Sequence, residues 1–204
     1  MLLTFERLKT LGVELAKNRS LEKTNARLLE DISKRVDAAL ERNPVEKPVV
    51  LEVGTGNGVT SHELALNPKY SGKVHFIAVN HNLEAGLSEE RLRLLKRKAR
   101  NAKKSVKTFI TGKDFHDSAL NEIFKQTGKK PVVENPESLP KLLIADASKM
   151  ELKPESIDVA FSSMSAPFFD DKALALERLY RSLKKGGVMV VNIDCTDAQE
   201  RVPF

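Results

Sequence analysis

Hydrophobic residues in the first part of the chain recur every three or four positions, which is the spacing of amphipathic helices. One such segment runs from about Thr4 to Asn18, and a second runs from about Ser20 to Arg42. Asn43-Pro44 ends the second segment, because the residue before a proline is pushed out of the helical region. We expect residues 1–44 to form a helical lid over a core made by residues 45–204.

Beyond Pro48 the pattern changes to short apolar runs separated by helical segments. The runs predict strands buried on both faces, at residues 49–53, 73–79, 142–145, 157–162 and 188–193. Helices are predicted at residues 60–66, 88–102 and 170–185. This alternation predicts an α/β fold of the doubly wound type with a mainly parallel sheet, whose ligands bind at the carboxyl ends of the strands.

Residues 104–140 interrupt the alternation and are interpreted as an insertion. Within it, residues 107–111 suggest a strand and residues 117–126 a helix, whereas residues 129–140 hold three prolines and predict a loop. The end of the chain is the other irregularity. Residues 194–204 are too few for two more strands and a helix, so the sheet would expose the edge of its last strand. We expect the N-terminal segment, the insertion or a second subunit to cover that edge.

The composition adds few constraints. A chain of 204 residues that is 41% hydrophobic suits one domain. No apolar run approaches the roughly 20 residues that span a bilayer. The single cysteine, Cys195, excludes an internal disulfide and a cysteine-based metal site. We therefore expect a cytoplasmic protein with no membrane partner and no metal.

The charge is unevenly distributed. The chain has a formal net charge of +6, and residues 91–107 contain nine Lys or Arg and no acid. Apolar residues form a stripe along this predicted helix, so the basic residues cover its other faces. Such a surface is either a solvated helix face or a surface that follows the phosphates of a nucleic acid.

The most informative segment is the glycine loop after the first core strand. Glycines at positions 54, 56 and 58 permit a sharp turn and let a ligand approach the backbone closely. The dinucleotide-binding fingerprint G-x-G-x-x-G would need its third glycine at position 59, which is Val59. An acid, Glu52, precedes the loop within an otherwise apolar strand.

The segment Val50-Leu51-Glu52-Val53-Gly54-Thr55-Gly56-Asn57-Gly58 resembles the first motif of class I S-adenosylmethionine (SAM)-dependent methyltransferases, E/D-x-G-x-G-x-G. The resemblance continues downstream over about Val49 to Asp194. Asp146-Ala147 resembles the family's adenine-contacting motif, and residues 158–163 resemble its fourth strand. Residues 183–188 resemble its L-K-P-G-G turn, with Lys185 in place of the proline.

The resemblance implies a SAM-dependent methyltransferase whose product is S-adenosylhomocysteine, with an unidentified acceptor that is either a small molecule or a nucleic acid. It implies a role for each candidate residue in binding SAM. Glu52 would lie beneath the ammonium of the amino-acid tail, with Gly54, Thr55, Gly56 and Gly58 around the tail and ribose. Asn80 replaces the family's acid at the ribose hydroxyls, and His81 lies beside it. Asp146 and Ala147 would contact adenine, and Ser162 and Ser163 would lie near the methionine tail.

Three points stay open at this stage. Asp114, after residues 107–111, is a rival for the adenine-contacting acid, although the short spacing from Asp146 to the next strand favours Asp146. No catalytic residue is assigned, with His81 and Asp170 as candidate general bases. Residues 165–168 lie where amino-methylating relatives carry N/D-P-P-Y/F, but they match it poorly and suggest a loop whose Phe168 and Phe169 wall the pocket.

Two alternative functions are kept beside the first. One is a methyltransferase-like binding protein without catalysis, which the Asn80 substitution favours. The other is a methyltransferase directed at RNA or DNA, which the basic segment at residues 91–107 favours.

Overall fold

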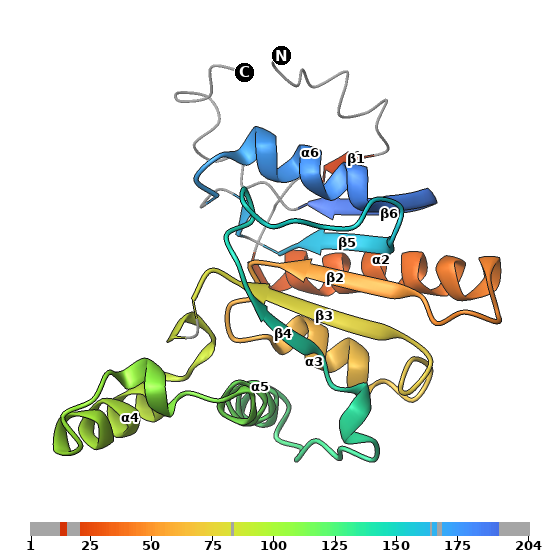
Figure 1. Cartoon of the computed structure of the whole chain (residues 1–204). Helices are drawn as coiled ribbons and strands as arrows, with labels where there is room; N and C mark the ends of the chain where they lie inside the picture. Colours follow the sequence, from red (N-terminus) through yellow and green to blue (C-terminus); the bar gives the residue numbers. More distant parts are fainter. Residues whose placement is uncertain (1–12, 16–20, 83, 164, 167–168, 192–204) are drawn as a thin grey trace.

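The computed structural model describes residues 13–15, 21–82, 84–163, 165–166 and 169–191. Its centre is a sheet of six strands in the order β1-β6-β5-β2-β3-β4, and every neighbouring pair is parallel. The strands are β1 (Val13–Leu15), β2 (Val49–Val53), β3 (His75–Asn80), β4 (Lys141–Ile144), β5 (Ile157–Ser162) and β6 (Leu183–Val191). The predicted α/β architecture with a mainly parallel sheet is confirmed (Figure 1).

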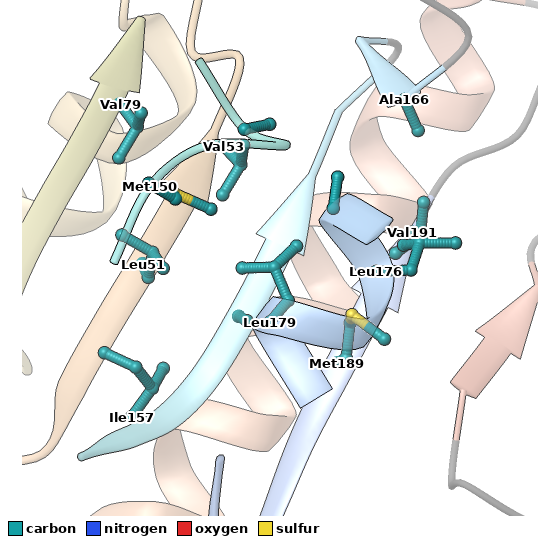
Figure 2. Packing of buried hydrophobic residues seen from close by; sticks show 13 residues of the cluster. Leu51, Val53, Val79, Met150, Ile157, Ala166, Leu176, Leu179, Met189 and Val191 are labelled. Atoms are coloured by element: carbon teal, nitrogen blue, oxygen red, sulfur yellow. The ribbon is translucent and has the colours of Figure 1, made fainter. Parts of the chain in front are cut away.

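Helices cover both faces of the sheet. The helices are α2 (Leu21–Arg42), α3 (Val59–Leu66), α4 (Glu89–Asn101), α5 (Gly112–Thr127) and α6 (Lys172–Ser182), with single turns η1 (Glu84–Gly86), η2 (Val106–Phe109) and η3 (Pro136–Ser138). Successive strand residues point to opposite faces. Accordingly, Leu51 belongs to the apolar cluster under α6, whereas Val50 belongs to the cluster under α2 and α3. Figure 2 shows the first cluster, in which Leu176 and Leu179 of α6 pack over β5 and β6.

The N-terminal prediction was partly wrong. Residues 13–15, expected within the helix at residues 4–18, form β1, and the rest of that segment lies outside the described residues. β1 pairs with β6, where Val13 faces Met189 and Leu15 faces Val191. The pairing supplies hydrogen bonds to an edge that would otherwise be open. The expectation that the N-terminal segment covers this edge is therefore confirmed.

The second N-terminal helix was predicted correctly, but its place differs from a lid. Buried Leu28, Ile32 and Val36 of α2 pack in one cluster with Val50, Phe161 and other residues of the sheet. The helix thus lies along a sheet face and not over the carboxyl ends of the strands. No helix within the described ranges is long and apolar enough to cross a membrane.

Two further boundaries needed correction. Residues 107–111 were expected to form a strand, but η2 occupies most of them, and Thr111 caps α5 through a capping box with Asp114. β4 takes the sheet position beside β3, so Asp114 is excluded as the adenine-contacting acid. The helix predicted to Lys185 ends at Ser182, because β6 begins at Leu183 and pairs there with Ile157. Gly186, with a φ of 77°, lies where the β5–β6 register shifts.

Candidate functional site

The glycine loop joins the carboxyl end of β2 to the start of α3. Gly54, Gly56 and Gly58 all have positive φ, at 72°, 56° and 77°, which non-glycine residues rarely adopt. The N–H groups of Gly54 and Thr55 both donate to the carbonyl of Val79, at 2.8 and 3.0 Å. These bonds fasten the loop to the end of β3, next to the sheet position that ligands of such folds occupy.

Glu52 lies beneath this loop and is buried, with 2% of its surface exposed. The hydroxyl of Thr55 donates to its Oε2 at 2.6 Å. Burial raises the pKa of Glu52 to about 7, and hydrogen bonds from Thr55 and Ser61 only partly oppose that rise. The carboxyl group therefore titrates near neutral pH, and it reaches the loop surface only through Thr55.

Asn80 is hydrogen-bonded to the glycine loop. Its Oδ1 accepts from the Gly56 N–H at 3.0 Å, and its Nδ2 donates to the Gly56 carbonyl at 2.8 Å. The buried amide thus bonds to both backbone polar groups of Gly56 and holds that residue of the glycine loop. A carboxylate at this position would make only the first of the two bonds, so the amide suits the clamp.

The insertion supports the loop from below, which the sequence interpretation missed. A Cβ on Gly58 would lie 2.4 Å from Cζ of Phe115 on α5. His62 of α3 packs edge-on against Phe115, and its Nδ1 lies 2.7 Å from the Gly58 carbonyl. Its Nε2 lies 2.9 Å from Nδ1 of His116. Because Nδ1 of His62 must donate to the carbonyl, His116 donates to His62.

A small cavity opens at the carboxyl ends of β2, β3 and β4. Its volume is about 60 Å³. It is lined by Val53, Gly54, Val79, His81, Ala145, Asp146, Ala147, Phe169 and Asp170. Four of the predicted cofactor residues, from three strand ends, therefore meet at one place. Phe169 lines the cavity as expected, together with His81 and Asp170, whereas Phe168 lies outside the described residues.

Asp146 and Ala147 form the far side of that cavity. Oδ1 of Asp146 accepts from the Ser148 N–H at 2.9 Å and from its hydroxyl at 2.7 Å, and Oδ2 accepts from Lys149 at 2.8 Å. Lys149 and then Ser148 hold the pKa of Asp146 well below its usual range, so the group is ionised. Within the described part of the chain, the Ala147 N–H has no hydrogen-bond partner.

A family model described as a methyltransferase domain matches residues 95–191. Residues 95–191 are therefore similar to the methyltransferase domain family. The expected resemblance to methyltransferases, a family of enzymes, is confirmed for this segment, which includes Asp146-Ala147 but not the glycine loop. None of the curated proteins matches the chain.

Solved structures of methyltransferases resemble this domain at low identity. A candidate SAM-dependent methyltransferase from Methanococcus maripaludis is 16% identical, with a TM-score of 0.42, and the match covers 87% of this chain and 67% of that one. The complex of the Haloferax volcanii Trm112 methyltransferase activator with a candidate methyltransferase matches at 16% identity with a TM-score of 0.41, and the match covers 82% of this chain and 54% of that one. A Haemonchus contortus phosphoethanolamine N-methyltransferase, bound to phosphomonomethylethanolamine and S-adenosylhomocysteine, matches at 17% identity with a TM-score of 0.42. That match covers 78% of this chain and 27% of the other. The chain thus spans only part of these proteins.

The loop after β5 restricts the space beside the glycine loop. Ser162 is buried, and its hydroxyl lies 3.2 Å from that of Ser165, while Ser163 is half-buried beside them. The Ser165 hydroxyl donates to the Gly54 carbonyl at 2.7 Å, and a Cβ on Gly54 would lie 2.3 Å from the Cβ of Ser165. Ser165 therefore occupies the space beside Gly54. The poor match of residues 165–168 to the amino-methylating motif was the one signal in the sequence that pointed to this loop.

Proposed function

We propose that this domain binds SAM across the carboxyl ends of β2, β3 and β4 and transfers its methyl group to an acceptor at the same edge of the sheet. The observation that carries this proposal is the cavity that Gly54, His81, Asp146 and Ala147 share. These residues come from three strand ends, and the sequence predicts each of them as a cofactor contact.

The residues around the cavity suit the parts of SAM, provided that Ser165 moves. Gly56 has open space where a Cβ would be, so a ribose can approach its backbone there. The Ala147 N–H is available to a ring nitrogen of adenine, and the ionised Asp146 keeps a lone pair for an exocyclic amine. The cavity of about 60 Å³ is well below the roughly 300 Å³ of small-ligand sites. We infer that SAM binding displaces Ser165 from Gly54.

The domain's own task in the reaction is alignment and the exclusion of water. SAM supplies an electrophilic methyl group on a positively charged sulfonium. Because that charge disappears as the methyl group moves, the site has little need to stabilise new charge, and positioning dominates. Phe169 closes one wall of the cavity against water, while Asn80 keeps Gly56 fixed. If the acceptor atom carries a proton, His81 or Asp170 can accept it from the same cavity.

The sharpest test uses two glycines with the same backbone conformation. Gly56 and Gly128 both have positive φ and open space at the Cβ position, and asparagine tolerates that conformation better than other side chains. Gly56→Asn places a side chain where SAM would lie, whereas Gly128→Asn lies at the end of α5. We expect calorimetry to show at least tenfold weaker SAM binding for Gly56→Asn only. Equal affinities in the two variants would refute the site.

A second candidate function is a non-catalytic protein of the same fold. Ser165 favours it, because its hydroxyl bonds and its Cβ fill the approach to Gly54. The two functions differ in the behaviour of Ser165→Gly, which removes the obstructing side chain. If neither the wild type nor Ser165→Gly binds SAM at millimolar concentration, the non-catalytic function is supported. The nucleic-acid-directed alternative concerns the acceptor and depends on α4.

A further inference from the structure

The second half of α4 and the turn that follows carry seven exposed cations. They are Lys96, Arg97, Lys98, Arg100, Lys103, Lys104 and Lys107, which we call the α4 basic surface. None of them forms an ion pair with an acid in the described ranges, whereas Arg91 pairs with Asp114 and Arg93 with Glu89. Outside residues 91–107 the chain has 25 Lys or Arg against 28 acids, so its whole positive excess lies in this segment.

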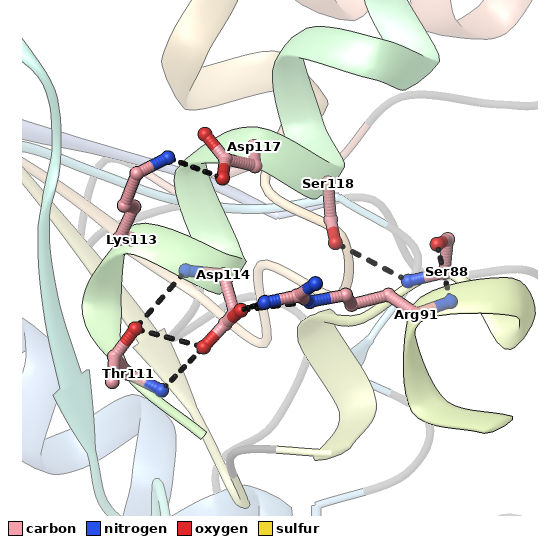
Figure 3. Close-up of polar contacts among 7 residues, drawn as sticks. All are labelled: Ser88, Arg91, Thr111, Lys113, Asp114, Asp117 and Ser118. Atoms are coloured by element: carbon pink, nitrogen blue, oxygen red, sulfur yellow. Dashed lines mark hydrogen bonds and ion pairs between the residues drawn. The ribbon is translucent and has the colours of Figure 1, made fainter. Parts of the chain in front are cut away.

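The helix is held in a fixed place by its first turn. Figure 3 shows Arg91 donating to Asp114 at the start of α5, and the Ser88 N–H donating to the Ser118 hydroxyl at 3.4 Å. α4 then projects away from the sheet (Figure 1). Its anchored end adjoins the glycine loop, since Gly86 packs against Gly56 and Asn80. A partner lying along α4, which is about 20 Å long, would therefore reach the methyl-donor site.

We propose that the α4 basic surface binds the phosphates of a folded RNA and presents that RNA to the methyl-donor site. The proposal rests on the proposed function, because it names the class of acceptor. Lys96, Arg97 and Lys98 are consecutive and point about 100° apart, so they suit phosphates that surround the helix. A folded RNA brings phosphates from several strands together, and it is recognised largely by shape.

The surface does not suit a membrane. Interfacial helices need a broad exposed apolar face, but Leu95 and Ala99 of α4 are buried against the protein. Leu94, at 41% exposure, is the one exposed large apolar side chain of α4. The surface also lacks aromatic residues for base stacking, so its contacts are with phosphates and independent of base sequence.

The test compares two fourfold variants that lower the net charge equally. The surface variant is Lys96→Gln, Lys98→Gln, Arg100→Gln and Lys104→Gln. The control variant is Lys47→Gln, Lys153→Gln, Lys172→Gln and Lys185→Gln, all exposed and without an ion-pair partner in the described ranges. Glutamine has nearly the helix propensity of lysine, so both variants should fold. The probe is a fluorescein-labelled 30-nucleotide RNA hairpin, followed by anisotropy between 50 and 200 mM salt.

We expect the surface variant to bind the hairpin about 30-fold or more weakly at 100 mM salt, with a log–log salt slope smaller by about 3. The control should stay within threefold of wild type. Equal losses in both variants would overturn the proposal. Tighter binding of a DNA hairpin of the same sequence, or of phosphatidylserine vesicles, would overturn the choice of RNA. SAM calorimetry on the same samples separates the two proposals, because RNA binding without SAM binding would refute the proposed function, and with it the acceptor role of the RNA, but not the contact of the α4 basic surface with RNA.

Discussion

The difference in unfolding free energy between the Glu52→Gln variant and the wild type should depend strongly on pH. Burial raises the pKa of Glu52 from 4.5 to about 7, so the native state favours the neutral acid while the unfolded chain ionises freely. The resulting loss of unfolding free energy in the wild type is absent below pH 4.5 and grows until the pH passes 7. At 1.36 kcal/mol per unit, integration between pH 5 and pH 8 gives about 2.5 kcal/mol in favour of Glu52→Gln.

The assay is urea unfolding of both proteins at pH 5 and pH 8. For a slope of about 2 kcal/mol/M, the midpoint difference should grow by roughly 1 M towards Glu52→Gln. Glu151→Gln, at an exposed position, is the matched control and should show no change in the difference. A Glu52→Gln difference that is flat between the two pH values would mean that Glu52 is ionised in the native protein, and the reasoning from its burial would fail.

The wild type itself should conceal this effect, because a nearby group acts in the opposite direction. Burial lowers the pKa of His62 from 6.5 to about 4, so the native state favours the neutral imidazole. Its penalty grows as the pH falls from 6.5 towards 4 and amounts to about 3 kcal/mol. The Glu52 and His62 contributions therefore nearly cancel between pH 4.5 and pH 6.5. A flat wild-type profile, with opposite slopes in the two single variants, is the expected signature.

The remaining predictions concern packing and the site. His62→Gln should make the domain more stable as the pH falls from 7 to 4, because only the Glu52 penalty then changes with pH; urea unfolding tests this, and a profile as flat as that of the wild type would contradict it. Gly58→Ala should cost about 3 kcal/mol in the same assay, through its positive φ and the clash with Phe115, whereas Gly112→Ala at an open position should cost nothing. Ser165→Gly should tighten SAM binding by roughly tenfold, the value of about one hydrogen bond; unchanged affinity would show that Ser165 does not obstruct the site.

The core strands and the site residues that follow them were predictable from the sequence. The run at residues 49–53 is apolar except for Glu52 because β2 is covered on both faces, and Asp146 follows a strand that pairs beside β3. Each of these signals is local. Parallel strands place their carboxyl ends at one edge, so the meeting of Gly54 with Asp146 follows from the fold class alone.

The errors arose where long-range contacts decide the structure. Val13 and Leu15 fit a helical spacing, but pairing with β6 outweighs that local preference. The clamp between Asn80 and Gly56 joins residues 24 positions apart, and the contact of Phe115 with Gly58 crosses from the insertion to the core. No periodicity reports such contacts, because they depend on how the elements pack and not on their own sequences.

The pairing of β1 with β6 has a consequence for synthesis on the ribosome. Val13 emerges early, yet its partner Met189 belongs to the last described strand, so the N-terminal strand must wait for almost the whole domain to be translated. Until then, the hydrogen-bonding groups of β1 are available to other nascent chains, and closing so long a loop slows folding. A chaperone that shields β1 on the nascent chain should therefore raise the yield of folded protein more than one that acts after release.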